Sequence, residues 1–568
     1  MIVIQNRSFR LKLLIVLVVV AFGGITAYLF QLQIVNADLF YKQSQKNFLR
    51  TREIAPPRGS IIDCKGVVLA SNVPVYSLSW QGSGNKTVTS EQEKLIALLQ
   101  SVFALTPKQI DLIKLHEKRA TRVKLFFDIS FDQIASIIEQ ISHEKNIALE
   151  QTYKRSYPHA ALASHIIGYI GLNNNAPGKM GLELLYNKEL RGKSGKIITI
   201  INAVGRNLQA YAVKGSLAGT TLQTTLDSEV QQLAERTFPP GYEGSCILMD
   251  ESGALEVVLS RPSFDPLLFL KPLEASQWKL LQEKHRFMNR AFSGCYPPAS
   301  LFKLVTLVAA LETGIIQQKI NWHCIGHTTF RGRRYHCNNR AGHGILSTEE
   351  ALAHSCNIPF FEIGKKINID TLALYARELG LGTKMGILFP ESSGLIPTSA
   401  WKKRVKKEQW FPGETLSAAI GQTAMLVTPL QIAGMFSAFC SGYRCIPRIL
   451  IDEPIVTQKL SLKPETLTFI QQCLSSVIKE GTGSHLKSLK NFTLKGKSGT
   501  AQVRALGKKV LCKEHLCHGY LAVHFRYKDN RPRTLVVLIE HAGSSSVAVK
   551  VAHTFLKRYA ALIDARNP

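Results

Sequence analysis

Acidic residues are scarce in this chain of 568 residues. It has 41 Asp and Glu against 70 Lys and Arg, which leaves a formal net charge of +29. The basic residues are spread along the sequence, and no nucleic-acid-binding module is recognisable, so we exclude nucleic acid as a partner. The surplus suits a protein that works beside anionic lipid headgroups and other anionic polymers. Internal repeats and low-complexity segments are also absent, and the length predicts two to four domains.

Charged side chains are missing altogether between Lys12 and Asp38, where the sequence is almost wholly apolar. Residues 13–35 are long enough to cross a bilayer as one helix, which takes about 20 apolar residues. A cleaved signal peptide would have a shorter apolar core and a small-residue end, whereas this segment ends in bulky residues. Basic residues precede the span, so we expect residues 1–12 in the cytoplasm and the rest of the chain outside.

Ser300 and Lys303 form a Ser-x-x-Lys motif at the start of a predicted helix. Pro297 and Pro298 can begin a helix, and apolar residues then recur at helical spacing until Gly314. We therefore expect Ser300 in the first turn, with Lys303 one turn later on the same face. Because burial disfavours a charged lysine, a neutral Lys303 could accept the Ser300 proton. Taken alone, the pair is more often a helix-capping serine beside a surface lysine.

Two later motifs change that interpretation. Ser355-Cys-Asn357 and Lys497-Ser-Gly-Thr500 follow at domain-scale spacings, and the apolar residues before the last motif predict a strand. The three motifs in this order resemble the penicillin-recognising serine acyltransferases, which comprise the penicillin-binding transpeptidases and the serine β-lactamases.

Other stretches extend the resemblance to the class B penicillin-binding proteins over nearly the full chain. They are Arg58-Gly-Ser-Ile-Ile-Asp63, Gly181-Leu-Glu183, Ser260-Arg-Pro-Ser-Phe-Asp-Pro266, Gly421-Gln422, Thr428-Pro-Leu-Gln431 and Gly481-Thr-Gly483. The resemblance implies an α/β (α+β) transpeptidase domain, an antiparallel sheet flanked by helices, on an elongated pedestal with one N-terminal transmembrane helix. We place the pedestal, a dimerisation-like domain, at 36–217 and the transpeptidase domain at 218–568. The space before the pedestal is too small for a glycosyltransferase module, which excludes the bifunctional class A type.

The resemblance also implies a reaction. Ser300 would attack the penultimate carbonyl of a peptidoglycan stem peptide that ends in D-Ala-D-Ala, with Lys303 as the base. Ser355 would relay the proton to the leaving amine, and Asn357 would hydrogen-bond Lys303 and a substrate amide. β-Lactams would acylate the same serine.

The late motif would bind the substrate backbone and its carboxylate. Lys497, Ser498 and Thr500 would hold the terminal carboxylate, and Gly499 would leave room for the substrate to dock as an added strand. The backbone N–H groups of Ser300 and Thr500 would form the oxyanion hole.

A glycine–histidine–glycine stretch points to one branch of the family. Gly342-His343-Gly344 resembles the sequence before the second motif in elongation-type members, the penicillin-binding protein 2 type. We therefore favour a role in cell-wall elongation and shape at the bacterial inner membrane, with a division-type transpeptidase as the alternative. The family implies a polytopic membrane glycosyltransferase of the elongation machinery as the partner.

Eleven cysteines are many for an exported protein, where pairs usually form disulfides. Cys324, Cys337, His343 and Cys356 follow the pattern Cys-x12-Cys-x5-His-x12-Cys, which suits a structural, tetrahedral zinc bracing the second motif. Some elongation-type members carry zinc here with carboxylates among the ligands, where this chain has Cys324 and Cys337. A Cys324–Cys337 disulfide with Cys356 as a buried thiol is the alternative.

Two other functions use similar motifs. A membrane-anchored β-lactamase or β-lactam sensor lacks this pedestal, and no base for deacylation is identifiable near Ser300. A non-enzymatic scaffold would not need all five side chains expected for chemistry, which are Ser300, Lys303, Ser355, Asn357 and Lys497.

Overall fold

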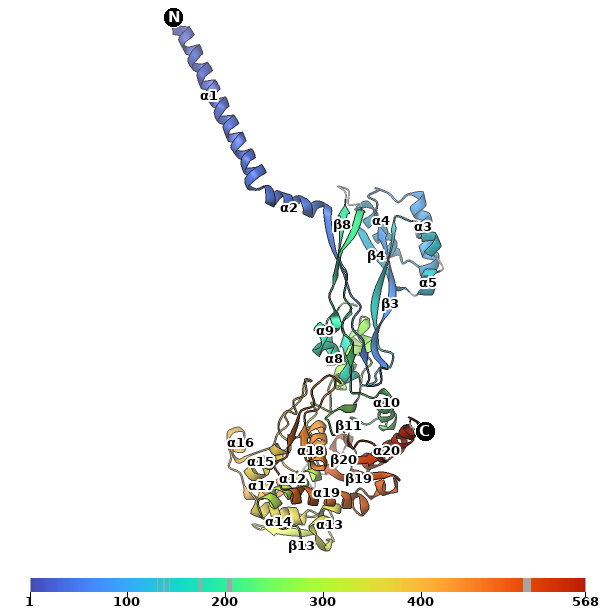
Figure 1. Ribbon diagram of the computed structural model, residues 1–568, viewed down its shortest axis with the longest axis vertical. Coiled ribbons are helices and arrows are strands. Elements are labelled where there is room, and N and C mark those ends of the chain that lie inside the picture. Colours follow the sequence, from blue (N-terminus) through green and yellow to red (C-terminus); the bar gives the residue numbers. More distant parts are fainter. Residues whose placement is uncertain are drawn as a thin grey trace. The chain divides into compact units, whose positions relative to one another are not determined.

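The computed structural model describes residues 2–129, 131–135, 138–141, 144–172, 176–201, 207–503 and 512–566. They form two compact units that interleave in sequence (Figure 1). The first comprises Met1–Pro57, Val73–Lys154 and Gly192–Gly219, and the second comprises Arg58–Asn72, Arg155–Arg191 and Thr220–Pro568. The domain limits 36–217 and 218–568 stay a prediction.

The first unit begins with a long apolar helix. Helix α1 (Ile2–Phe30) continues through a π-helical turn, η1 (Gln31–Val35), into α2 (Ala37–Phe48). Phe9–Val35 has a mean hydropathy of 2.6 and no buried residue, and is long and apolar enough to cross a membrane. The expected single N-terminal span at 13–35 lies within it.

The first unit also contains strands of two sheets and a group of helices. Strands β1 (Leu49–Ile54), β8 (Gly195–Ile201) and β9 (Asn207–Lys214) form an antiparallel sheet in the order β1-β8-β9. The long strand β3 (Val68–Gln81) pairs with β4 (Arg122–Ile129) and β5 (Ile147–Ser156). Helices α3 (Ser90–Phe103) and α4 (Pro107–Lys118) each begin at a threonine capping box and pack on a core around Trp80.

The second unit is built on a five-stranded antiparallel sheet. Its order is β12 (Leu255–Arg261), β11 (Gly244–Asp250), β21 (Arg533–Ile539), β20 (His518–Tyr527) and β19 (Phe492–Ala501). The apolar side chains alternate between two cores, since Val536 and Leu538 join one and Leu535 and Val537 the other. Strand β19, which carries the Lys-Ser-Gly-Thr motif, lies at the edge of the sheet.

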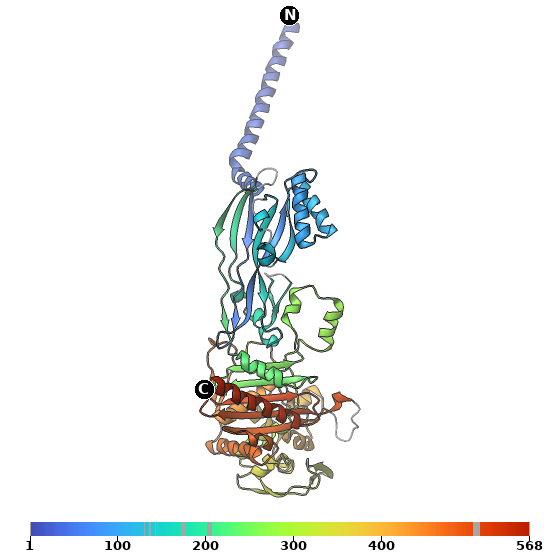
Figure 2. The ribbon, with the colours of Figure 1, turned by 90° about the vertical axis from the view of Figure 1, so that its right-hand side faces the viewer.

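Helices cover both faces of this sheet. Helices α10 (Ser228–Thr237) and α20 (Ser546–Arg566) pack on one core, and Figure 2 shows α20 in dark red beside the strands of the sheet. Helices α12 (Lys303–Glu312), α18 (Pro429–Ser441) and α19 (Pro464–Lys479) pack on the other. The expected antiparallel sheet flanked by helices is confirmed.

Short elements lie between the first two motifs and directly after the second. They are β13 (Asn321–Cys324), which pairs with β16 (Gly344–Ser347), the hairpin β14 (His327–Phe330) and β15 (Arg333–His336), α13 (Thr348–Ala353) and α14 (Ile358–Lys366).

The remaining elements are short connections and covering helices. The strands are β2 (Ile61–Ile62), β6 (Tyr169–Ile170), β7 (Gly178–Met180), β10 (Leu222–Gln223), β17 (Tyr443–Cys445) and β18 (Thr457–Lys459). The helices are α5 (Phe131–Ala135), α6 (Ile138–Ile141), α7 (Ser164–Ile167), α8 (Gly181–Leu185), α9 (Asn187–Arg191), α11 (Ala275–Glu283), α15 (Ile369–Glu378), α16 (Ser399–Val405) and α17 (Pro412–Ala419). The 3-10 turns are η2 (Pro266–Leu270), η3 (Ala299–Leu301), η4 (Ser484–Ser488) and η5 (Lys513–His515).

A buried carboxylate joins two of the motifs in the second unit. Glu183 accepts hydrogen bonds from Arg58 Nε at 2.5 Å and from Arg155 Nε at 2.6 Å, and Tyr157 donates to it at 3.3 Å. Glu183 is 0 % exposed, so the two arginines take the place of water in stabilising the buried carboxylate. The Arg-Gly-x-Ile-x-Asp and Gly-Leu-Glu motifs are therefore parts of one structural contact.

Candidate active site

Ser300 lies in a 3-10 turn of its own. The turn η3 precedes α12, whose first residue is Lys303, so Ser300 is not in the first turn of the α-helix as the sequence predicted. Ala299 has a left-handed backbone with φ 51°, and its N–H donates to Gly421 O at 3.2 Å. This bend lies at the start of η3, directly before Ser300, and it could not be read from the apolar spacing.

The Ser355 hydroxyl is the centre of the site. Its Oγ lies 3.0 Å from Ser300 Oγ and receives hydrogen bonds from Lys303 Nζ at 3.3 Å and Lys497 Nζ at 3.1 Å. Ser355 has a left-handed backbone, with φ 54°. Few non-glycine residues adopt this conformation without support from the surrounding structure. The loop after α13 therefore holds the hydroxyl between the nucleophile and both lysines.

Lys303 is fully buried and surrounded by oxygen acceptors. Its Nζ donates to Ser355 O at 2.7 Å, to Asn357 Oδ1 at 2.8 Å and to Cys356 O at 3.2 Å. Burial lowers the pKa of Lys303 to about 8, which makes the neutral amine accessible near neutral pH. The predicted contact between Asn357 and Lys303 is present in this geometry.

Lys497 contacts Ser355 from a different element, edge strand β19. It is also fully buried, and its Nζ donates to Ser498 O at 3.0 Å besides Ser355 Oγ. Burial and the positive charge of Lys303 lower the pKa of Lys497 well below its ordinary value. Since two buried lysines share one hydroxyl, a substrate anion beside Lys497 would stabilise its charged form.

The other side chains of the late motif contact different parts of the unit. Ser498 Oγ donates to Thr482 Oγ1 at 2.7 Å, and Thr500 Oγ1 accepts from the backbone N–H of Ser545 at 3.2 Å. A Cβ on Gly499 would make ordinary van der Waals contact with Ala299 Cβ, at 3.5 Å, so the packing beneath this strand does not itself require glycine. The role of Gly499 in substrate docking stays a prediction.

The four predicted metal ligands come together beside the second motif. Their ligand atoms lie within 4.8 Å of one another, and three of the residues are buried: Cys324, Cys337 and Cys356. Cys337 Sγ lies 3.7 Å from Cys356 Sγ, and His343 Nδ1 lies 3.5 Å from both Cys324 Sγ and Cys337 Sγ. The hydrogen bond between the two thiols lowers the pKa of the Cys337 thiol.

The disulfide alternative is not formed. All eleven cysteines fall within the described ranges, and each is a free thiol. The structure therefore contains a cysteine–histidine cluster at this position, and its backbone link to the second motif is the hydrogen bond from Asn357 N–H to Cys337 Sγ at 3.4 Å.

Family sequence models match most of the chain. The penicillin binding protein transpeptidase domain matches residues 244–557, and the penicillin-binding protein dimerisation domain matches residues 53–224. The chain belongs to the penicillin-binding protein transpeptidase family. The pedestal and transpeptidase parts expected from the motifs are both confirmed.

Individual relatives agree with the class B assignment. The chain is 29% identical over 592 residues to peptidoglycan D,D-transpeptidase MrdA of Acinetobacter baumannii, covering 96% of this chain and 86% of that protein. Among solved structures, the Helicobacter pylori complex of penicillin-binding protein PBP2 with MreC matches with a TM-score of 0.79 and 25% identity, over 91% of this chain and 99% of that one. A peptidoglycan synthase complex matches with a TM-score of 0.75 and 27% identity, over 97% of this chain and 98% of the other.

These likenesses decide between the branches. The chain is a class B penicillin-binding protein of the elongation type, as the resemblance implied. The division-type and β-lactamase alternatives are not favoured.

Three residues of this penicillin-binding protein support the site without having been assigned a role. Thr482 binds Ser498, and Gln422 Nε2 donates to Thr500 O at 3.2 Å. Both belong to short family stretches that the sequence shows without explaining. Ser545 acts through its backbone N–H, for which no side-chain pattern gives a signal.

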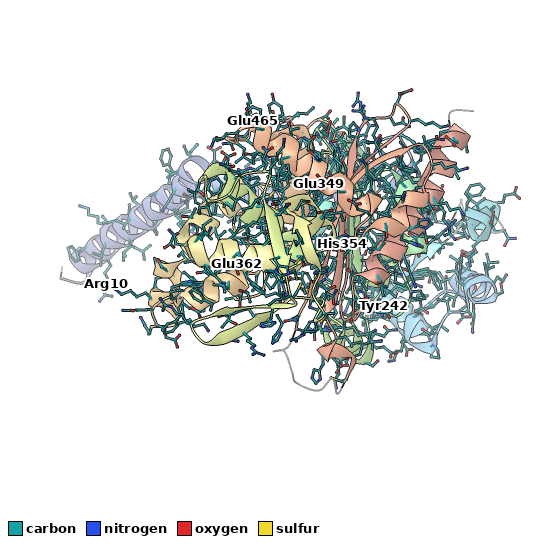
Figure 3. All side chains as sticks on the ribbon, turned by 90° about the horizontal axis from the view of Figure 1, so that it is seen from below. Arg10, Tyr242, Glu349, His354, Glu362 and Glu465 are labelled. Atoms are coloured by element: carbon teal, nitrogen blue, oxygen red, sulfur yellow. The ribbon has the colours of Figure 1, made fainter. Side chains whose placement is uncertain are left out.

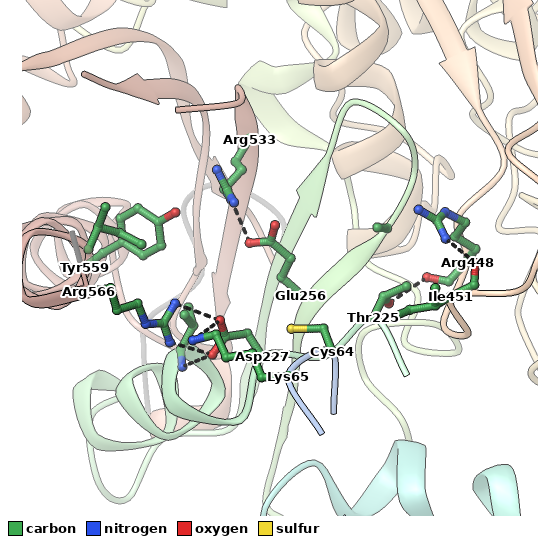
Figure 4. Close-up of a pocket in the computed structure, with 13 residues that line it drawn as sticks. Cys64, Lys65, Thr225, Asp227, Glu256, Arg448, Ile451, Arg533, Tyr559 and Arg566 are labelled. Carbon is green, nitrogen blue, oxygen red and sulfur yellow. Dashed lines mark hydrogen bonds and ion pairs between the residues drawn. The ribbon is translucent and has the colours of Figure 1, made fainter. Parts of the chain in front are cut away.

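A cavity of about 410 Å³ in the same unit is separate from the serine site (Figure 4). Arg566 there donates two hydrogen bonds of 2.8 Å to Asp227, and Arg533 donates to Glu256 at 2.7 Å. Asp227 also caps helix α10 by accepting from Val230 N–H at 3.2 Å. Because both carboxylates are paired with arginines, we interpret these residues as structural contacts that hold the surrounding elements together.

Proposed function

We propose that the chain is a peptidoglycan D,D-transpeptidase that cross-links stem peptides through an acyl-enzyme on Ser300 during cell-wall elongation. The observation that carries the proposal is the contact of 3.0 Å between Ser300 Oγ and Ser355 Oγ, with two buried lysines on Ser355. A serine hydroxyl in contact with a proton relay and a lysine of lowered pKa is the arrangement that nucleophilic catalysis requires.

The first half-reaction forms the acyl-enzyme. Ser300 Oγ attacks the penultimate carbonyl carbon of a peptide ending in D-Ala-D-Ala, and its proton passes through Ser355 Oγ to neutral Lys303. The same relay returns the proton to the departing amine as the C–N bond breaks and D-alanine leaves. In the second half-reaction an amine of another stem attacks the ester carbonyl, loses a proton to the relay, and Ser300 regains its hydroxyl.

Edge strand β19 supplies the substrate-binding groups. A peptide can pair with it as an added strand, because no other strand of the described sheet lies beyond β19. Lys497, Ser498 and Thr500 are the residues we assign to the terminal carboxylate. The backbone N–H groups of Ser300 and Thr500 are assigned to the oxyanion.

Labelled penicillin tests the acylation step. The full chain in detergent should form a covalent adduct on Ser300 that lasts for hours, and Ser300→Ala should form none. An adduct that hydrolyses within seconds would indicate a β-lactamase instead. In cells, Ser300→Ala should fail to maintain rod-like shape when it replaces the wild type, whereas normal growth and shape would favour a scaffold.

The cellular setting follows from the relatives. Solved relatives are a complex with MreC and a peptidoglycan synthase complex. We infer a polytopic glycosyltransferase of the elongation machinery as the partner of this chain. We also infer that helix α1 anchors it once in the inner membrane, with residues 1–12 in the cytoplasm and the catalytic domain outside.

We further propose that the cysteine–histidine cluster holds a structural zinc ion. Tetrahedral zinc with bonds of about 2.3 Å to sulfur and about 2.0–2.1 Å to nitrogen requires S···S edges of about 3.8 Å and S···N edges of about 3.6 Å. The S···S distance of 3.7 Å and the S···N distances of 3.5 Å fit these edges. The ligands would be Cys324, Cys337, His343 and Cys356, and the ion would stabilise the loop that carries Ser355.

A further inference from the structure

A long stretch between the first two catalytic motifs contains no carboxylate. Residues 313–348 have no Asp or Glu, and their cationic side chains are Lys319, Arg331, Arg333, Arg334 and Arg340. Four of these five lie in or directly after the hairpin β14–β15, and we call residues 327–340 the basic hairpin. All formally charged side chains of this segment are therefore positive.

The hairpin has a defined geometry. Phe330 pairs with Arg333 and His327 with His336, so the turn between the strands has two residues. These are Arg331 and Gly332, with φ of 48° and 78°. Positive φ at both turn positions is the form that matches the twist of a two-stranded hairpin.

One face of the hairpin is packed and the other is exposed. Tyr335 is buried, its ring meets Phe361 at 5.5 Å between centroids, and its hydroxyl donates to Gly413 O at 3.2 Å. Since neighbouring residues of a strand point to opposite faces, Arg334 and His336 face away from this packing, and both are exposed.

The exposed arginines are not neutralised within the protein. Throughout the described part of the chain, no ion pair involves Arg331, Arg334 or Arg340. Glu362, labelled in Figure 3 on α14, does contact the hairpin, but it accepts from Thr328 at 2.7 Å and pairs with Lys365 at 2.6 Å. Thr328 shares the packed face with Tyr335, which lies opposite it in the register.

The basic hairpin is directly joined to the catalytic residues. The carbonyl of His336, its last strand residue, accepts a hydrogen bond from Asn357 Nδ2 at 3.2 Å. The other end of the same amide, Asn357 Oδ1, accepts from Lys303 Nζ at 2.8 Å. One side chain therefore lies between the hairpin and the lysine of the reacting centre.

We propose that three exposed arginines of the basic hairpin, Arg331, Arg334 and Arg340, bind the carboxylates of an acidic peptide, the acceptor strand, beside Ser300. This rests on the proposed transpeptidase function and names the surface that the second strand uses. Arginines suit the role because their planar guanidinium groups can donate two parallel hydrogen bonds to one carboxylate. The unpaired positive charge of the arginines would attract a peptide with free carboxylates and would bind a peptide with amidated carboxylates more weakly.

Peptide binding by the full chain in detergent tests the proposal. The probe is a fluorescent tetrapeptide with three free carboxylates and no D-Ala-D-Ala end, compared with its fully amidated copy by anisotropy. Exposed ion pairs contribute about 0.2–1 kcal/mol each, so losing three should weaken binding on the order of ten-fold. We expect this loss, and a smaller salt dependence, in the triple variant Arg331→Gln, Arg334→Gln, Arg340→Gln.

A matched control removes the same charge elsewhere. Lys550→Gln, Lys557→Gln, Arg558→Gln changes three exposed cations of α20 and should bind the acidic probe as the wild type does. Retaining Arg333, whose guanidinium stacks over the Tyr335 ring at 5.4 Å, keeps the hairpin packed. An unchanged circular dichroism spectrum and melting temperature of the hairpin variant would confirm that its fold is intact.

Three results would overturn the proposal. The first is equal binding of the acidic and amidated probes by the wild type. The second is peptide binding by the hairpin variant that is as tight as that of the wild type. The third is a hairpin variant that binds the acidic peptide normally but binds vesicles of anionic phospholipid more weakly than the wild type does. Acylation of the wild type by labelled penicillin is measured on the same preparation. Failure of acylation contradicts the proposed function, whereas the peptide titration still reports on the hairpin, because the probe is not a donor substrate.

Discussion

The hydroxyl of Ser355 lies 3.0 Å from the hydroxyl of Ser300. Two lysines from different elements, the start of α12 and edge strand β19, both donate to Ser355. Ser355 therefore connects the base, the nucleophile and the carboxylate-binding strand.

Ser355→Ala should slow acylation by penicillin about 100- to 10,000-fold, because general acid–base catalysis contributes that much and the relay is lost. The measurement is the second-order rate of adduct formation with labelled penicillin. Ser475→Ala is the matched control, since Ser475 Oγ bonds only the carbonyl of Gln471 in its own helix, at 3.0 Å. Rates that are the same in both variants would remove Ser355 from the relay.

The zinc proposal predicts about one metal equivalent in the purified full chain, with a fall in melting temperature on chelation. Cys356→Ser should lose the metal, and it should melt at a lower temperature. Cys473→Ser changes a buried cysteine of α19 outside the cluster and should keep the metal. A metal-free protein of unchanged melting temperature would show that the thiols pack without an ion.

Glu183→Ala should lower the free energy of unfolding by about 3–5 kcal/mol, since it leaves buried cations without their carboxylate. The affected groups are Arg58 and Arg155, both nearly inaccessible to water. Glu283→Ala removes an exposed helical pair with Lys279 and should change stability by less than about 0.5 kcal/mol. Denaturant titration of both variants measures the difference, and equal midpoints would contradict a structural role for the Arg-Gly-x-Ile-x-Asp contact.

Three buried histidines predict a loss of stability in acid. Burial lowers the pKa of His165, His518 and His524 to about 4 each, below the ordinary value of 6.5 that applies in the unfolded chain. Between these values the unfolded chain binds more protons than the folded one, so stability rises with pH and is lost as the pH falls from 6.5 towards 4.

The melting temperature should therefore fall between pH 7 and pH 5. His165→Gln keeps a donor for Arg286 O, which His165 Nε2 contacts at 2.8 Å, and it should reduce the pH slope. A slope that is the same in this variant would mean that His165 is not one of the groups responsible.

Much of the site follows from sequence because its chemistry lies in short, ordered motifs. The positions of Ser300, Lys303, Ser355 and Lys497 needed only residue types and spacing, and the apolar residues before Lys497 indicated a strand, whose place at the edge of the sheet came from the structure. The 3-10 turn at Ser300 was not, because it depends on the left-handed backbone of Ala299 and its contact with Gly421.

Contacts across long sequence separations were equally hidden. Thr482 and Gln422 reach the late motif from loops that sequence patterns place only roughly. The buried Arg58–Glu183 contact joins residues 125 positions apart, and neither motif contains a pattern that identifies the other as its partner. Tertiary packing, and not local propensity, decides such pairs.

The most direct test supplies the full chain with a stem pentapeptide ending in D-Ala-D-Ala and follows it by mass spectrometry. We expect a peptide ester on Ser300, release of one D-alanine for each ester, and a cross-linked dimer once a stem with a free amine is added. Ser300→Ala should give none of the three. Dimer formation by Ser300→Ala, or release of D-alanine by the wild type without any ester on Ser300, would contradict the proposed acyl-enzyme mechanism.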